Sequence, residues 1–387
     1  PLMGLIVQPL VGKYSDRTWT RLGRRIPYLF LGSIIAILVM CMLPNAGNFG
    51  LAVGGAMIFG LISLMLLDTS INVAMQPFKM LVGDQVNEKQ KGLAYSIQSF
   101  LCNAGSLVGY LAPIIFTAIG ISNIAPKGQV PDSVTYAFYV GAAILILCVF
   151  YTFATVKEMP PKEYAEFHGF ADEATDKKEE KKESMLSLLI HAPKVFWTVG
   201  LVQFFCWCAF MYMWTYTNGA IADTVWGTTD TSSTEYQEAG NWVGVLFAVQ
   251  AVGSVIWATL IPRFNSYKMA YFVSLLLGGI GFISTMFIHD QYVLFISYIL
   301  IGCAWAAMLA LPFTILTNSI SGKNMGTYLG LFNGTICLPQ IVAATVGGLL
   351  LSLVGGSQVN MLVLAGVLLI AGAASVFVIK ETSVEKK

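Results

Sequence analysis

Long apolar stretches alternate with short polar connections along almost the whole chain. The hydrocarbon core of a bilayer is about 30 Å thick, so a helix that crosses it needs about 20 mostly apolar residues. The pattern predicts eleven such helices, the first of them cut short, at residues 1–12, 26–44, 50–78, 92–120, 135–156, 194–222, 241–262, 269–288, 291–318, 325–354 and 358–380. The sequence therefore predicts an all-α polytopic membrane protein.

One segment, residues 157–192, breaks this pattern. It holds six Lys and nine Asp or Glu, which is 15 of the 43 charged residues of the chain. A segment this polar cannot bury a core, so we expect a solvated, cytoplasmic linker. It separates an N-terminal half, residues 1–156, from a C-terminal half, residues 193–387.

The basic residues predict the orientation. If the connection between the first two helices is cytoplasmic, alternation places 21 of the 22 Lys and Arg residues on the cytoplasmic side, as the positive-inside rule requires. The C-terminus is then cytoplasmic and Pro1 lies outside. We expect one further span before Pro1, which would give six helices on each side of the linker.

A short internal repeat supports two related halves. Pro77-Phe78 is followed fourteen residues later by Gly92, and Pro312-Phe313 is followed thirteen residues later by Gly326. The offset of about 235 residues places both motifs on the third helix from the end of their half. Duplicated six-helix halves are typical of one large class of transporters.

Composition excludes several other classes of protein. Only 11% of the residues are charged, against about 25% in soluble domains, and the net charge of +1 gives no reason to expect nucleic acid. All seven Cys lie in apolar stretches, which favours neither disulfides nor a metal site. The chain has no nucleotide-binding or hydrolase motif. We expect no enzyme activity, cofactor or metal.

Asp68 is the charged side chain that lies deep inside an apolar stretch. A carboxylate at that depth costs several kcal/mol unless it pairs, takes up a proton or faces water. We therefore predict that Asp68 loads a proton on one side of the membrane and releases it on the other. The alternative is a structural carboxyl group that is hydrogen-bonded to a neighbouring helix.

Polar side chains elsewhere in the predicted helices are candidate ligands for a hydroxyl-rich substrate. Asn72 and Gln76 follow Asp68 at intervals of four residues and form one stripe on its helix. Amides can bind hydroxyl groups, and aromatic faces can cover the apolar face of a sugar ring. Interhelical hydrogen bonding is the alternative role for the amides. The candidate substrate-binding residues are Gln8, Asp68, Asn72, Asn103, Trp207, Gln250, Asn333 and Gln340.

Three segments resemble one transporter family. They are VQPLVGKYSDRTWTRLGRRIPY from Val7 to Tyr28, the series from Leu66-Leu67-Asp68 through Asn72 and Pro77 to Asp84, and GLFNGTICLPQ, which contains Asn333 and Gln340. Together they resemble the sucrose/maltose–proton symporter group of the major facilitator superfamily, the glycoside-pentoside-hexuronide:cation symporter-like proteins. The chain differs from the plant members at Lys79, where they carry Arg.

The resemblance implies a fold and a function. The fold would be the major facilitator fold, with two six-helix halves and a substrate site near the bilayer midplane. The protein would import a maltose- or sucrose-like disaccharide with H⁺ across the inner membrane of a bacterium, as a monomer in the lipid bilayer. Alternatives are a sodium-coupled or exporting sugar transporter, and a sugar-binding membrane receptor that does not transport.

Charged residues at the helix ends are candidates for a conformational latch. Carboxylates and guanidinium groups form charge-assisted hydrogen bonds that can hold helix ends together in one state of a transporter. Arg21 is assigned to membrane orientation alone. The predicted latch residues are Asp16, Arg17, Arg24, Arg25, Lys79 and Asp84.

Overall fold

The computed structural model describes residues 2–50, 53–86, 88–126, 129–160, 163, 189–319 and 331–379. Within these ranges the chain is helical, and its only β contact is an isolated bridge between Thr20 and Gly23. Ten of the described helices are long and apolar enough to cross a membrane. The prediction of an all-α polytopic membrane protein is confirmed.

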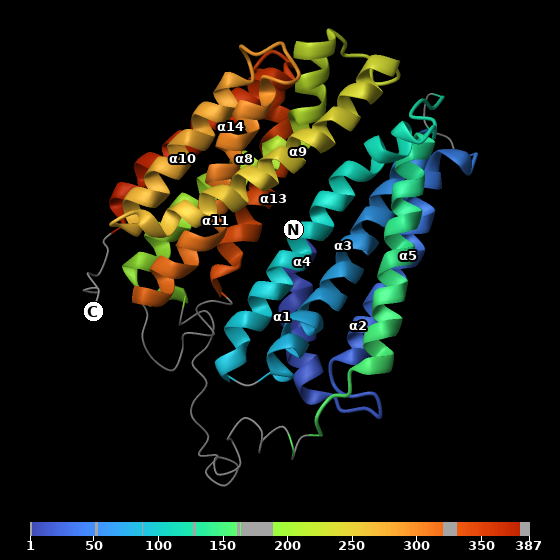
Figure 1. Ribbon diagram of the computed structural model, residues 1–387, viewed down its shortest axis with the longest axis vertical. Coiled ribbons are helices and arrows are strands. Elements are labelled where there is room, and N and C mark those ends of the chain that lie inside the picture. Colours follow the sequence, from blue (N-terminus) through green and yellow to red (C-terminus); the bar gives the residue numbers. More distant parts are fainter. Residues whose placement is uncertain are drawn as a thin grey trace. The chain divides into compact units, whose positions relative to one another are not determined.

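The chain divides into two compact units, Pro1–Lys182 and Glu183–Lys387. In Figure 1 the helices of the first unit run from blue to green along the chain. They are α1 (Leu2–Arg17), α2 (Ile26–Met42), the short 3₁₀ helix η1 (Leu43–Asn48), α3 (Val53–Asp84), α4 (Glu88–Ala118) and α5 (Asp132–Thr155).

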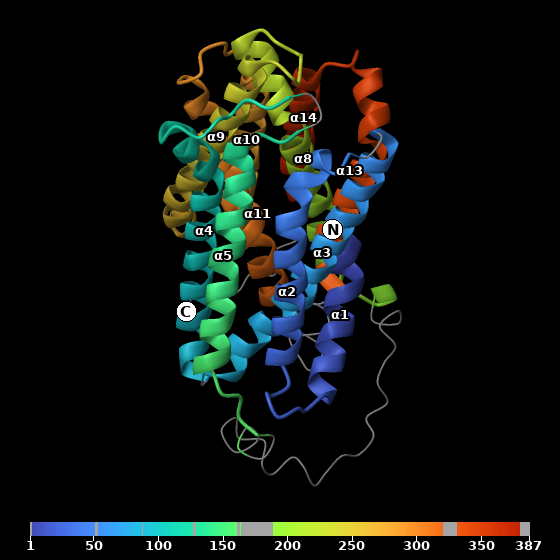
Figure 2. The same ribbon diagram turned by 90° about the vertical axis from the view of Figure 1, so that its right-hand side faces the viewer.

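Within the first unit, α2 packs against both α3 and α5, and α1 packs against α3. Figure 2 shows α1, α2 and α3 lying side by side. Gly32 makes the contact between α2 and α3 close, because a Cβ there would lie 2.7 Å from the backbone oxygen of Ser70. The centre of α3 is therefore held between two neighbouring helices.

The described residues of the second unit form six long helices and two short 3₁₀ helices. They are α8 (Lys194–Trp226), α9 (Thr234–Leu260), η3 (Ile261–Arg263), α10 (Tyr267–Ser284), α11 (Leu294–Ser319), α13 (Gly334–Leu353), α14 (Gln358–Ser375) and η4 (Val376–Val378). Ser233, Ser266 and Ser357 begin α9, α10 and α14 as N-caps, each accepting a backbone N–H. Gly227, at a φ of 66°, ends α8 in the left-handed conformation that glycine adopts readily.

The second unit packs around α8, which contacts α9, α11, α13 and α14. Its core includes many aromatic side chains, among them Phe196, Phe210, Tyr271 and Tyr298. Small residues bring the backbones together: a Cβ on Gly302 of α11 would lie 2.4 Å from the backbone oxygen of Gln250 on α9. Within a bilayer the hydrophobic effect does not drive helices together, and helices associate instead through close packing at small residues.

The helix boundaries differ from the predicted ones at several places. The apolar part of α1, Met3–Gly12, is shorter than a membrane span, whereas α3 continues past residue 78 to Asp84. Pro77 lies inside α3 and Pro312 inside α11, and each of these helices is the third from the last of the long helices described in its unit. The predicted linker, residues 157–192, falls largely outside the described residues.

Candidate functional site

Asp68 lies in the middle of α3, on a helix that continues without interruption from Val53 to Asp84. Its side chain is half-buried, and Asn72, one turn further on, is only 5% exposed. The Asn72 side-chain Nδ2 donates to Asp68 Oδ1 at 3.0 Å and to the Asp68 backbone oxygen at 2.7 Å. The carboxyl group therefore has a hydrogen-bond donor directed at it from its own helix.

Gln8 of α1 extends this polar contact to a second helix. Its Nε2 donates to Asn72 Oδ1 at 2.6 Å. Gly12 lies one turn after Gln8 on α1, and a Cβ added to it would lie 3.8 Å from Gln76 Nε2. The stripe of Asp68, Asn72 and Gln76 that the sequence predicts on α3 thus faces α1 at Asn72 and Gln76, and three predicted substrate-binding residues lie together.

A second group of polar residues joins the ends of four segments of the first unit. Asp84, at the end of α3, accepts a hydrogen bond from Arg24 Nη2 at 2.9 Å and from Arg25 Nε at 3.1 Å, both on its Oδ2 atom. Arg25 is 3% exposed and also donates to Ser15 Oγ of α1 at 2.6 Å. The structure therefore brings together three of the predicted latch residues.

Glu158, which follows α5, completes this group. Its carboxylate accepts the backbone N–H groups of Arg24, Arg25 and Ile26 at 3.0, 2.8 and 2.8 Å. These groups lie at the start of α2, where four backbone N–H groups lack helical partners and the helix dipole favours negative charge. We refer to Ser15, Arg24, Arg25, Asp84 and Glu158 as the helix-end cluster.

Of the three remaining predicted latch residues, the structure describes the side chain of one. Lys79 is exposed on α3. The side chains of Asp16 and Arg17 lie outside the described residues. Glu158 was not predicted, because its position within a highly charged segment assigned it to the linker.

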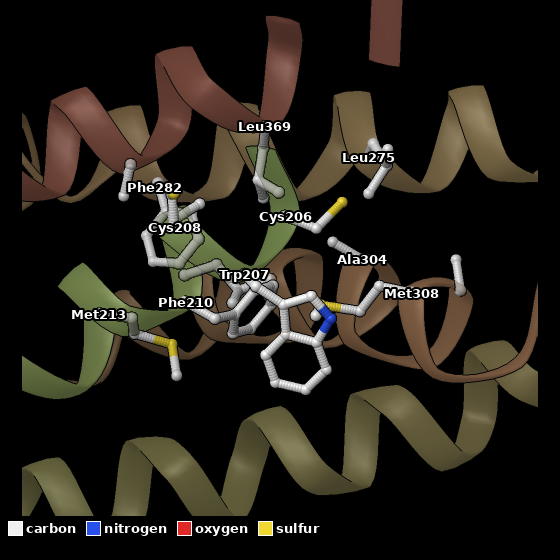
Figure 3. Close-up of a cluster of buried hydrophobic side chains, with 14 of the residues drawn as sticks. Cys206, Trp207, Cys208, Phe210, Met213, Leu275, Phe282, Ala304, Met308 and Leu369 are labelled. Atoms are coloured by element: carbon white, nitrogen blue, oxygen red, sulfur yellow. The ribbon is translucent and has the colours of Figure 1, made fainter. Parts of the chain in front are cut away.

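Trp207 of α8 belongs to an aromatic group in the core of the second unit. Its ring lies 5.9 Å from that of Trp305 and 6.4 Å from that of Trp214, measured between ring centres, and it is 7% exposed. Figure 3 shows Trp207 and Phe210 among side chains from α10, α11 and α14. The indole Nε1 is buried and has no hydrogen-bond partner among the described residues.

The other predicted amides lie on three helices, α4, α9 and α13. Gln250 is buried on α9, and Asn103 is exposed on α4. Asn333 begins α13, with its Nδ2 4.0 Å from Cys337 Sγ, and Gln340 Nε2 donates to the backbone oxygen of Ile336 at 3.2 Å. Of these amides, the second unit holds Gln250, Asn333 and Gln340, and the first holds Asn103.

Gln203 is a polar residue that was not among the predicted site residues. It is fully buried on α8, one turn before Trp207. Its Nε2 donates to the backbone oxygen of Met308 at 3.4 Å, while its Oε1 has no partner in the described part of the chain. The sequence does carry a signal for it, because Gln203 is a polar residue at the start of the aromatic stretch of α8. Trp207, which follows in that stretch, was selected as the candidate sugar ligand instead.

The chemistry available to this arrangement is proton binding and hydrogen bonding. Among the described residues no group of three or more His, Cys, Asp or Glu side chains is placed to hold a metal ion. A carboxyl group within an apolar helix can exist with or without a proton, and the amides around it can bind either form. The arrangement can therefore bind a proton and the hydroxyl groups of a solute.

Comparison with known proteins agrees with this chemistry. The chain is 22% identical to the sucrose transport protein SUC4 of Arabidopsis thaliana over 433 residues, which covers 100% of this chain and 82% of the relative. It is 29% identical to the general alpha-glucoside permease of Schizosaccharomyces pombe over 119 residues, or 29% of this chain and 22% of the relative.

Solved structures show the same fold. The crystal structure of a D-xylose-proton symporter superposes with a TM-score of 0.70 at 15% identity, covering 100% of this chain and 88% of that one. The family model described as MFS/sugar transport protein matches residues 2–356. The chain therefore belongs to the MFS/sugar transport protein family and is a multi-pass membrane sugar transporter of the major facilitator type.

Proposed function

We propose that this transporter imports a disaccharide, a maltose- or sucrose-like glucoside, together with a proton. The observation that carries the proposal is the position of Asp68, a carboxyl group in the middle of an apolar helix with the Asn72 amide bonded to it. Ionisable groups inside membrane helices are costly and usually mark the path of an ion or proton. The inferred location is the inner membrane of a bacterium, with a cytoplasmic C-terminus.

The geometry around Asp68 favours a proton over a sodium ion. Transporters commonly hold Na⁺ with backbone carbonyl groups that an interrupted helix releases. Here α3 is continuous through Asp68, and the backbone oxygen of Asp68 accepts the amide of Asn72. A proton needs only the carboxyl group itself.

The relatives support the substrate class. The plant relative is named a sucrose transport protein and the yeast relative a general alpha-glucoside permease. Both names describe carriers of glucosides. Amides for the hydroxyl groups and aromatic rings for the sugar face are present in both units, with Gln8 and Asn72 in the first and Trp207 in the second.

The mechanism is alternating access. Protonated Asp68 and sugar bind from outside, the protein changes conformation, and sugar leaves inward before Asp68 releases its proton. The helix-end cluster acts as the latch of one state, because Asp84 holds both arginines of the α2 start. Breaking and remaking these bonds is then part of the transport cycle.

The test is uptake of radiolabelled maltose and sucrose into proteoliposomes, with and without an inward proton gradient. We expect the native protein to concentrate one of these sugars only when the gradient is present. Asp68→Asn should lose concentrative uptake but keep the exchange of internal for external sugar, because exchange needs no net proton movement. A sodium gradient in place of the proton gradient serves as the matched control.

Each other function gives a different result. Concentration driven by sodium alone would identify a sodium symporter. Sugar binding without uptake would identify a receptor, and full concentrative uptake by Asp68→Asn would contradict the role of Asp68.

A further inference from the structure

Pro312 of α11 leaves a backbone oxygen of its own helix without the usual donor. The oxygen of Met308 would normally accept the N–H of the residue four positions further on, but that residue is Pro312, which has no N–H. Gln203 Nε2 of α8 donates to this oxygen at 3.4 Å. Because a carbonyl oxygen only accepts, the amide atom that faces it must be Nε2. The Gln203 amide is therefore oriented by α11, with its Oε1 directed away from the Met308 oxygen.

This orientation places a buried acceptor next to a buried donor. Gln203 Oε1 and Trp207 Nε1 are both buried without a partner among the described residues. The two residues are four positions apart and share one face of α8, where Cβ atoms lie about 5–6 Å from each other. The same neighbouring helix packs on both, since the Trp207 ring lies 5.9 Å from that of Trp305 on α11. Figure 3 shows the indole nitrogen of Trp207 on the side of the ring that faces Met308.

One acceptor and one donor on the same helix face define the ligand that fits them. A hydroxyl group carries one hydrogen to donate and lone pairs that accept. A single oxygen atom can therefore bond Gln203 Oε1 through its hydrogen and Trp207 Nε1 through a lone pair. A carboxylate has no hydrogen for Oε1, and an ammonium group has no lone pair for the indole N–H. Hydrogen bonding between helices, the usual structural role of a membrane amide, uses only Nε2 of Gln203 here.

The pair lies close to the exposed surface of the second unit. Trp214 is 40% exposed, and its ring centre lies 6.4 Å from that of Trp207. The ring of Trp305 lies 5.8 Å from that of Trp214. The buried donor is therefore one ring away from an exposed aromatic side chain, against which the apolar side of a sugar ring can pack.

We propose that Gln203 and Trp207 bind one hydroxyl group of the transported sugar, with Gln203 accepting its hydrogen and Trp207 donating to its oxygen. This inference rests on the proposed substrate class and extends it, because the pair makes one hydroxyl position of the sugar necessary for tight binding. It gives Trp207 a polar contact in addition to the aromatic contact that the sequence predicts. A trapped water molecule has the same hydrogen-bonding chemistry, and the experiment separates the two.

The experiment is competition binding to the purified full-length transporter at fixed pH, with labelled maltose and sucrose and their monodeoxy analogues. In the native protein we expect one hydroxyl position whose removal weakens binding about 25-fold, or about fivefold for each of two hydrogen bonds. Gln203→Met and Trp207→Phe should each reduce this ratio to about fivefold, and the double variant to within about twofold. The ratios at the other positions should stay native.

A fluorine atom at the same sugar position distinguishes the two contacts. Fluorine cannot donate a hydrogen bond, so it places an acceptor opposite Gln203 Oε1 and leaves both unsatisfied. The fluoro analogue should therefore bind weakly to the native protein and to Trp207→Phe. In Gln203→Met, where no acceptor faces the fluorine, it should bind within about threefold of the parent sugar. A general loosening of the core would not separate the two variants in this way.

Two substitutions at exposed positions of α8 are the matched controls. Leu201→Met and Trp197→Phe introduce the same side chains at residues that are 43% and 52% exposed, and both should keep the native ratios. Unchanged binding of the deoxy analogue shows that a variant is folded. Gln203→Met with the fluoro analogue decides the question by itself if Trp207→Phe does not fold.

The other outcomes would overturn the proposal. Native ratios in both variants would mean that the pair holds water rather than a sugar hydroxyl. An equal fall at every position would mean a disturbed site and no specific contact. Binding of neither sugar by the native protein would overturn the proposed substrate class and this inference together. The expected binding pattern with uptake that ignores the proton gradient would contradict the proposed coupling alone, and would support the hydroxyl contact.

Discussion

Gly23 shows how one residue shapes the helix-end cluster. It adopts a φ of 104°, a region that residues with a Cβ rarely enter. Its missing side chain also makes room for Glu158, because a Cβ there would lie 2.5 Å from Glu158 Cδ. The turn before α2 therefore needs glycine for its backbone and for the carboxylate that caps the helix.

We predict that Gly23→Ala destabilises the protein more than Gly120→Ala does, although both substitutions place alanine in a left-handed backbone conformation. Gly120 has a similar φ of 97° but open space around its Cβ position, so Gly120→Ala measures the conformational cost alone, about 1–3 kcal/mol. Gly23→Ala should lose about 1–3 kcal/mol more from steric overlap. Thermal unfolding in detergent compares the two. Equal losses would show that Glu158 does not press on this turn.

Gln203 is a fully buried amide with one long hydrogen bond. Its Oε1 is buried without a partner in the described residues, and such a group costs about 1–3 kcal/mol. An apolar side chain of the same shape would avoid that cost. An amide at this position suits a group that transiently binds sugar or water.

We predict that Gln203→Met unfolds at the same temperature as the native protein or a few degrees higher, while its transport rate falls. The reason is that the substitution removes an unsatisfied acceptor and only one long hydrogen bond, to Met308. Thermal unfolding and sugar uptake of the same preparation provide the measurement. Gln203→Glu, which buries a charge, is the control and should unfold at a lower temperature. A drop of several degrees in Gln203→Met would instead mean that the amide is structural.

At the scale of elements, the sequence predicted the helices well and their contacts poorly. Apolar stretches of about 20 residues identify membrane helices because the bilayer fixes their length. The stripe of Asp68 and Asn72 followed from helical spacing, but the partner of Asn72 on α1 depends on how two helices pack. Spacing along one helix carries no information on that contact.

Glu158 shows what a closer look at the sequence could have found. Arg25 occupies the N-cap of α2 and forms no side-chain cap there, although Ser, Thr, Asp or Asn is usual. A helix start without its own cap indicates that an acceptor comes from elsewhere. The charge density of residues 157–192 hid this acceptor, because the sequence pattern assigned the whole segment to a solvated linker.

The contact between α9 and α11 gives a prediction at this scale. A Cβ on Gly302 would lie 2.4 Å from the backbone oxygen of Gln250 and 2.9 Å from the backbone nitrogen of Ser254, so Gly302→Ala must push the two helices apart. We expect a loss of about 1–3 kcal/mol in stability, seen as a lower unfolding temperature. Gly348 of α13 has open space at its Cβ position, and Gly348→Ala should be neutral or stabilising because alanine favours helix. Similar effects of the two variants would contradict the close packing of α9 on α11.

At the scale of the whole molecule, the distribution of charge is what connects the fold with transport. Of 43 charged residues, Asp68 is the one that the sequence places deep in an apolar helix, and the others lie at helix ends or in connections. The basic residues of the connections orient the protein in the membrane. Under the proposed function, Asp68 is the group through which a proton gradient would act on the conformational cycle.

A single carboxyl group in the membrane interior predicts a stoichiometry of one proton per sugar. One charge moving through 100 mV gains about 2.3 kcal/mol, and a tenfold concentration ratio costs about 1.4 kcal/mol. In proteoliposomes held at 100 mV, negative inside and without a pH gradient, sugar should therefore accumulate about 50-fold and no further. The plateau ratio of labelled sugar, measured against the imposed potential, checks this value, and its logarithm should rise in proportion to the potential. Two protons per sugar would raise the ratio to about 2,500-fold. That result would require a second proton site. Apart from Asp68, the sequence places no acidic side chain deep in an apolar stretch.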